Sequence, residues 1–174
     1  MMAALVAVLS LGACYWGPDP VQYAALAVVD GRPAAVVAAC GRPQIDVTVF
    51  LDGDQPDHAL HLWSVTLTLP NPVDQVEVGL LAAPQPGWKV SPGTEPDPGA
   101  TPGGIPIVAL TSIEPGRHYT LDSSTSGPEG SRAPAVTFTT DDLPRIGQGQ
   151  VLAATGRDRP TVISRESFVH QRCG

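Results

Sequence analysis

The chain of 174 residues contains little lysine, few aromatic residues and few charges of either sign. One Lys stands against nine Arg, 5% of the residues are aromatic and 16% are charged. The formal net charge of −7 disfavours contact with a phosphate backbone, so we expect no nucleic-acid partner. Because aromatic residues are scarce, a core must be built mainly from Val, Leu, Ile and Ala, which the 43% hydrophobic content can supply.

The chain also has no apolar segment long enough to cross a membrane. Residues 3–11 are apolar and uncharged, but as a helix they would rise only about 14 Å, whereas the bilayer core is about 30 Å thick. This length is typical of the h-region of an export signal, although no Lys or Arg precedes it. A buried N-terminal strand is the alternative interpretation.

Motifs that would indicate catalysis are missing as well. The chain has no Gly-x-Ser-x-Gly turn for a nucleophilic serine and no Gly-x-x-x-x-Gly-Lys phosphate loop. We therefore expect a non-catalytic protein without a cofactor. An enzyme whose residues come together only in the folded chain stays open as an alternative.

The apolar segment ends in Leu-Gly-Ala-Cys at residues 11–14, which resembles the lipobox of bacterial lipoproteins. The resemblance implies that residues 1–13 are a cleaved signal peptide, that Cys14 carries lipid and that residues 14–21 form a spacer. It further implies a protein on the extracytoplasmic face of the cell membrane, since two or more acyl chains anchor stably. The excess of Arg over Lys, with abundant Ala, Gly, Pro and Val, is typical of GC-rich genomes such as those of actinobacteria.

Three cysteines leave an odd thiol unless one of them is modified. With Cys14 lipidated, Cys40 and Cys173 remain, and an exported protein can join them in a disulfide. The chain-entropy model assigns about 4–5 kcal/mol to a bond that closes a loop of about 130 residues. Two free thiols are the alternative.

Alternating and apolar runs predict a chain that is mainly β. Asp30-Gly31 between two apolar runs predicts an N-terminal β-hairpin over residues 22–43. Ser164 is expected to cap a short helix over Arg165–Arg172. Further strands are expected at Gln44–Leu51, Leu60–Leu69, Val73–Leu81, Ile105–Thr111, Ala133–Thr140, Gln150–Ala154 and Thr161–Ile163, with a short edge strand at Trp88 and Val90.

Residues 113–121 contain an aliphatic residue, Pro-Gly and then Tyr119 at the start of a strand. This resembles the turn before strand F of fibronectin type III and related immunoglobulin-like domains, where a tyrosine corner ties the hydroxyl to upstream backbone. The resemblance implies an immunoglobulin-like β-sandwich over residues 44–140, closed by a strand with Val136 and Phe138 pointing inward. The hairpin and a tail over residues 141–174, tied to Cys40, are then expected to flank the sandwich as one appendage.

An acidic stretch between two predicted strands is a candidate metal site. Carboxylate oxygens could hold a hard cation such as Ca²⁺, and nearby imidazoles a transition metal. An exposed turn is the alternative, since turns favour Asp and Gly. The candidate ligands are Asp52, Asp54, Asp57 and His58, with His61 as a further one.

Trp88 lies in a segment rich in Pro and Gly, residues 84–106, and is a candidate for binding a partner. Packing in the core is the alternative for Trp88, and it is the expectation for Trp63. Together these features favour a binding or scaffold module of the cell envelope, with an envelope protein or a glycan as partner. A metal-handling lipoprotein is the second hypothesis, and an envelope enzyme is the third.

Overall fold

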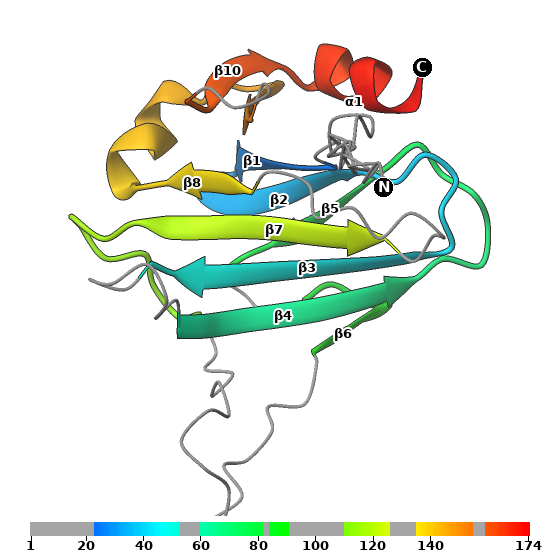
Figure 1. Ribbon diagram of the computed structural model, residues 1–174, viewed down its shortest axis with the longest axis horizontal. Coiled ribbons are helices and arrows are strands. Elements are labelled where there is room, and N and C mark those ends of the chain that lie inside the picture. Colours follow the sequence, from blue (N-terminus) through cyan, green and yellow to red (C-terminus); the bar gives the residue numbers. More distant parts are fainter. Residues whose placement is uncertain (1–22, 53–59, 82–83, 91–109, 126–134, 155–158) are drawn as a thin grey trace, which may run out of the picture.

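The computed structural model describes residues 23–52, 60–81, 84–90, 110–125, 135–154 and 159–174, which form two packed antiparallel sheets (Figure 1). Each sheet has five strands. The first sheet has the order β10 (Thr161–Ser164), β9 (Gln150–Ala153), β1 (Ala24–Val29), β2 (Arg32–Ala38) and β5 (Gln75–Gly79). The second has the order β6 (Trp88–Val90), β4 (Leu60–Thr68), β3 (Gln44–Leu51), β7 (Tyr119–Thr125) and β8 (Val136–Phe138).

The expected mainly-β sandwich is therefore confirmed. Strand β3 has the predicted bounds, and the edge strand expected at Trp88 and Val90 is β6. Val136 and Phe138 point into the core, as expected of the closing strand. Of the strand expected at Ile105–Thr111, the structure describes only Leu110 and Thr111, and neither lies in a strand.

The N-terminal hairpin and the C-terminal tail belong to the sandwich, whereas we expected them to flank it. Strands β1 and β2 of the hairpin pair with β5 on one side and with β9 of the tail on the other. The sequence-based boundaries at residues 44 and 140 thus separate strands that share one sheet. The physical reason is burial on both faces, because this sheet packs against the second sheet on one face and against α1 (Arg165–Cys173) on the other.

Burial on both faces also explains the composition of the hairpin. Its strands consist mostly of consecutive Ala and Val rather than alternating apolar and polar residues, which is the pattern of strands covered on both sides. Ala25, Val36 and Ala38 face α1, which inserts the fully buried Phe168 between them.

The second sheet shows the opposite pattern, with one buried and one solvated face. In β3, Ile45, Val47 and Val49 are fully buried, while the residues between them are half-exposed.

At the start of β7 the predicted tyrosine corner is present. The backbone N–H of Glu114 donates to the Tyr119 hydroxyl at 2.8 Å, and the Tyr119 ring stacks on Phe138 with centroids 5.6 Å apart.

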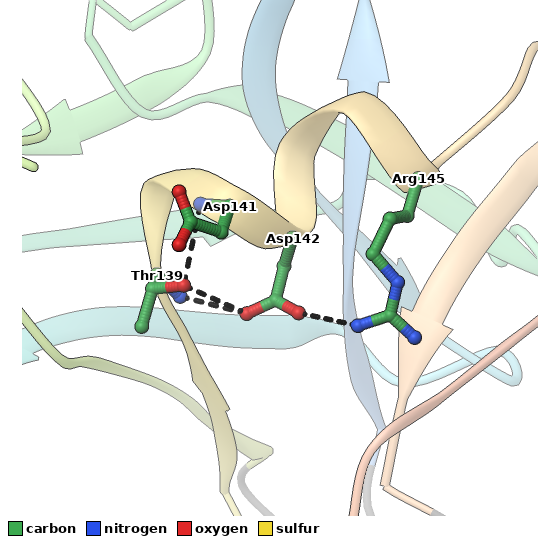
Figure 2. Close-up of polar contacts among 4 residues, drawn as sticks. All are labelled: Thr139, Asp141, Asp142 and Arg145. Carbon is green, nitrogen blue, oxygen red and sulfur yellow. Dashed lines mark hydrogen bonds and ion pairs between the residues drawn. The ribbon is translucent and has the colours of Figure 1, made fainter. Parts of the chain in front are cut away.

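A 3₁₀ helix, η1 (Thr140–Arg145), carries the chain from β8 of the second sheet to β9 of the first. A capping box closes its start, as Figure 2 shows. The Asp142 carboxylate accepts from the backbone N–H of Thr139 at 2.9 Å, and Arg145 donates to the same carboxylate at 2.9 Å. These contacts fix the crossing between the two sheets.

The C-terminal helix is attached to the hairpin both covalently and by packing. Ser164 caps α1 as expected, accepting from the backbone N–H of Ser167 at 3.0 Å. Cys40 and Cys173 are paired as expected, with their Cα atoms 5.0 Å apart. Cys40 sits in a tight turn with Gly41, and both have positive φ, of 50° and 74°.

Several predicted features lie outside the described residues. They are the signal peptide and spacer, Cys14, and the acidic residues Asp54 and Asp57 with His58. Within the described residues, no helix has the length and apolar character needed to cross a membrane.

Candidate binding site at the edge strand β5

Strand β5 ends the first sheet and leaves one of its sides without a neighbouring strand among the described residues. Two hydrogen bonds bracket its pairing with β2. Ala39 N–H donates to the Asp74 carbonyl at 2.7 Å, and Leu80 N–H donates to the Pro33 carbonyl at 3.0 Å. In an antiparallel ladder, alternate residues direct their backbone groups to the partner strand. The backbone groups of Val76 and Val78 therefore point to β2, while those of Gln75, Glu77 and Gly79 point to the open side.

The side chains of β5 divide between core and surface. Val78 is fully buried between the sheets, and Val76 packs partly against the same core. Gln75, Glu77 and Gly79 occupy the opposite face of the strand, which is the face of the sheet that carries α1. The open edge thus lies beside the helix.

Arg165, the first residue of α1, reaches across to β5 and contacts two of its side chains. Its Nε donates to Gln75 Oε1 at 2.9 Å, and a terminal guanidinium nitrogen pairs with Glu77 Oε2 at 2.6 Å. Both members of the ion pair are partly shielded from solvent. The contact fixes the edge strand against the helix and neutralises both charges locally.

Two open depressions lie on either side of this contact. The larger has a volume of about 700 Å³ and lies between the start of β5 and α1. The smaller, of about 370 Å³, lies at the other end of β5, where Arg32, Ala34 and Gly79 contribute to its lining. The space around Gly79 is open, since a Cβ added there would meet nothing within 4 Å.

The larger depression is acidic. The carboxylate-bearing Asp74 and Glu166 line it together with His170 and Cys173, and all four are exposed. Arg165 also contributes, but its charge is already paired with Glu77. The remaining charge therefore suits a cationic or hydrogen-bond-donating group.

Trp88 and Asp52, candidate residues that the structure describes, lie in or next to strands of the second sheet, away from this edge. Trp88 is only 9% exposed and packs in the main core, which agrees with the alternative of core packing. The Asp52 carboxylate, directly after β3, accepts from the Thr120 hydroxyl of the neighbouring strand β7 at 2.7 Å. Among the described residues, no group of three His, Cys, Asp or Glu side chains is placed to hold a metal. The proposed cation site involves residues beyond those described and stays a prediction.

Sequence reasoning did not single out β5 as a site. The alternating run predicts a strand over Val73–Leu81, within which β5 covers Gln75–Gly79, but alternation alone does not tell an edge strand from a central one. One signal was available. Short strands that carry a charged residue are typical of sheet edges, and Glu77 lies in the middle of a five-residue strand.

Comparison of the chain with protein-family models, curated proteins and solved structures found no match.

Proposed function

We propose that the protein is a lipid-anchored, extracytoplasmic module of the bacterial cell envelope that binds or scaffolds a partner and does not catalyse a reaction. The observation that carries the proposal is the juxtaposition of Cys40 and Cys173. It accounts for two of the three cysteines and leaves Cys14, at the end of the lipobox-like tetrad, for lipid. Disulfides persist in oxidising compartments outside the cytoplasm.

The architecture supports a binding role. Helix α1 covers one face of the first sheet, and the tyrosine corner fixes the start of β7 in the second. The capping box of η1 fixes the connection between the two sheets, so the molecule offers a rigid frame. Rigid β frameworks present partners with strand edges and loops whose positions do not change. The fold by itself does not define a ligand, and the candidate surface is the β5 edge.

The anchor is tested by expression of the full chain and a Cys14→Ser variant in a bacterial host that processes lipoproteins. We expect the wild type in the membrane fraction, with an intact mass that shows loss of residues 1–13 and gain of acyl chains. The Cys14→Ser protein should lack acyl mass and leave the membrane fraction. Cys173→Ser is the matched control, because it removes a cysteine but leaves the anchor, and it should stay with the membrane.

An unmodified Cys14 on a chain that retains residues 1–13 would overturn the proposal. Export would then lose its support. The β-sandwich would remain, but neither the localisation nor the membrane partner would.

A further inference from the structure

We infer that the open side of β5 receives an extended segment of a partner polypeptide as an additional strand of the first sheet. The inference deepens the proposed function and rests on it for the compartment in which the partner is met. Its physical basis is the row of main-chain groups that Gln75, Glu77 and Gly79 direct away from β2. Strand addition at a sheet edge satisfies such groups in pairs.

Strand β5 is favoured over the other edges by length. The edge strands β6 and β8 have three residues each and β10 has four, whereas β5 has five. In β5, the three alternate residues whose backbone groups point outward can each exchange main-chain hydrogen bonds with an added strand. Each exchange adds modest free energy, so a longer edge binds more tightly than a shorter one.

The two depressions give the added strand places for side chains. Residues directly opposite one another in paired strands point to the same face. Side chains of the partner opposite Gln75 and Gly79 would therefore project onto the α1 side of the sheet, about 13 Å apart. The larger depression lies at the first of these positions and the smaller at the second.

The charges at the larger depression indicate which kind of partner segment would bind. Asp74 and Glu166 supply carboxylates at the larger depression, while the nearby guanidinium of Arg165 is held by Glu77. A Lys or Arg of the partner would find complementary charge at this end. The formal net charge of −7 also favours encounter with a basic segment. The inferred partner is thus an extended, alternating polypeptide segment with a basic residue facing the helix.

The first test is amide hydrogen exchange of the soluble full-length Cys14→Ser protein, resolved by residue. The outward amides of Gln75, Glu77 and Gly79 should exchange rapidly in the free protein, while those of Val76 and Val78 are protected by β2. Slow exchange at the outward amides would overturn the inference, because it would show that another part of the chain already occupies the edge.

The second test adds a synthetic probe to the same protein. The probes are acetylated peptides of alternating threonine and valine that differ at one central position, which is lysine, serine or glutamate. The lysine peptide should bind most tightly and should slow exchange at the outward amides. Its advantage over the glutamate peptide should shrink at high salt. Protection at β6, β8 or β10 instead of β5, or no protection with any of the peptides, would contradict the inference.

A pair of substitutions at one position isolates the main-chain contribution. Glu77→Pro removes an outward N–H but no bond to β2, and proline is tolerated at such edge positions. Glu77→Gln removes the same charge and keeps the N–H. We expect Glu77→Pro to weaken peptide binding about tenfold and Glu77→Gln to change it much less. Equal binding by both variants would place the peptide elsewhere.

The exchange measurements on the unsubstituted strand keep the inference testable even if Glu77→Pro does not fold. The lipid anchor is tested separately by mass and fractionation. Loss of the anchor with intact peptide binding would overturn only the proposed localisation. The reverse result would overturn only the role of β5.

Discussion

At the residue scale, two hydroxyl groups on the buried face of β7 differ in what they contact. The Tyr119 hydroxyl accepts from the Glu114 N–H at 2.8 Å. Ser123 lies four residues further along β7, on the same face, and is 7% exposed. Its hydroxyl has no hydrogen-bond partner within the described part of the chain. A buried polar group without a partner costs free energy, whereas a bonded one contributes about 1 kcal/mol.

We therefore predict opposite effects for two conservative substitutions. Ser123→Ala should leave the free energy of unfolding unchanged or raise it by up to about 1 kcal/mol, because it removes an unpaired hydroxyl. Tyr119→Phe should lower it by about 1 kcal/mol, because the tyrosine corner is lost. Urea unfolding of the two variants measures both. A substantial loss in Ser123→Ala would show that the hydroxyl has a partner.

At the scale of elements, the short strand β6 depends on one large side chain. Trp88 is 9% exposed and Val90 is 52% exposed, although both belong to the same three-residue strand. The indole packs against the core, and β6 pairs with β4 along this contact. The strand is thus held to the sheet more by Trp88 than by its few ladder bonds.

Trp88→Ala should lower the free energy of unfolding by about 3–5 kcal/mol, the range for truncation of a large buried aromatic residue. Val90→Ala in the same strand is the control and should cost less than about 1 kcal/mol. Thermal or urea unfolding distinguishes them. A small loss in Trp88→Ala would favour the earlier hypothesis that the indole serves recognition.

Elements with strong local signals were predictable from sequence. Strand β3 matches its alternating run residue for residue, and Ser164 marks the start of α1 by its capping side chain. The tyrosine corner was predicted from Pro-Gly and Tyr119 alone. In each case the pattern that identifies the element lies within a few residues, so it can be recognised along the chain.

Pairings between distant segments were not predictable in the same way. Nothing local in β2 indicates that it pairs with β5, or that β9 joins β1 from the other side. The continuous apolar runs of the hairpin are typical of strands buried on both faces, but the identity of the covering elements depends on the whole fold. The candidate edge follows from this sheet order, which is why the sequence did not reveal it.

At the scale of the whole molecule, the bond between Cys40 and Cys173 joins positions 133 residues apart. Cys40 lies in a turn at a φ of +50°, a conformation that costs a residue with a side chain about 1–2 kcal/mol. Backbone hydrogen bonds of the turn itself, such as that from the Gly41 N–H to the Val73 carbonyl, favour this conformation with or without the bond.

Replacing both cysteines, as Cys40→Ser with Cys173→Ser, removes the bond and should lower the free energy of unfolding by about 2–5 kcal/mol. Cys40→Gly with Cys173→Ser also lacks the bond but suits the positive φ, and it should be about 1 kcal/mol more stable than the serine pair. Urea unfolding under identical conditions measures the difference. Equal stability of the two variants would show that the turn relaxes once the bond is gone.

The central position of β1 has a mechanical consequence. A tether attached ahead of Tyr23 pulls on a strand that lies between β2 and β9, and the proposed binding edge β5 is only one strand further away. If the partner is pulled from the end of the strands opposite Tyr23, tension between the proposed anchor and the partner would run along these strands and load their hydrogen bonds in shear, all together. A tether on an edge strand would instead peel the bonds one at a time. Forced unfolding is governed by its rate, so this placement favours a long lifetime under load.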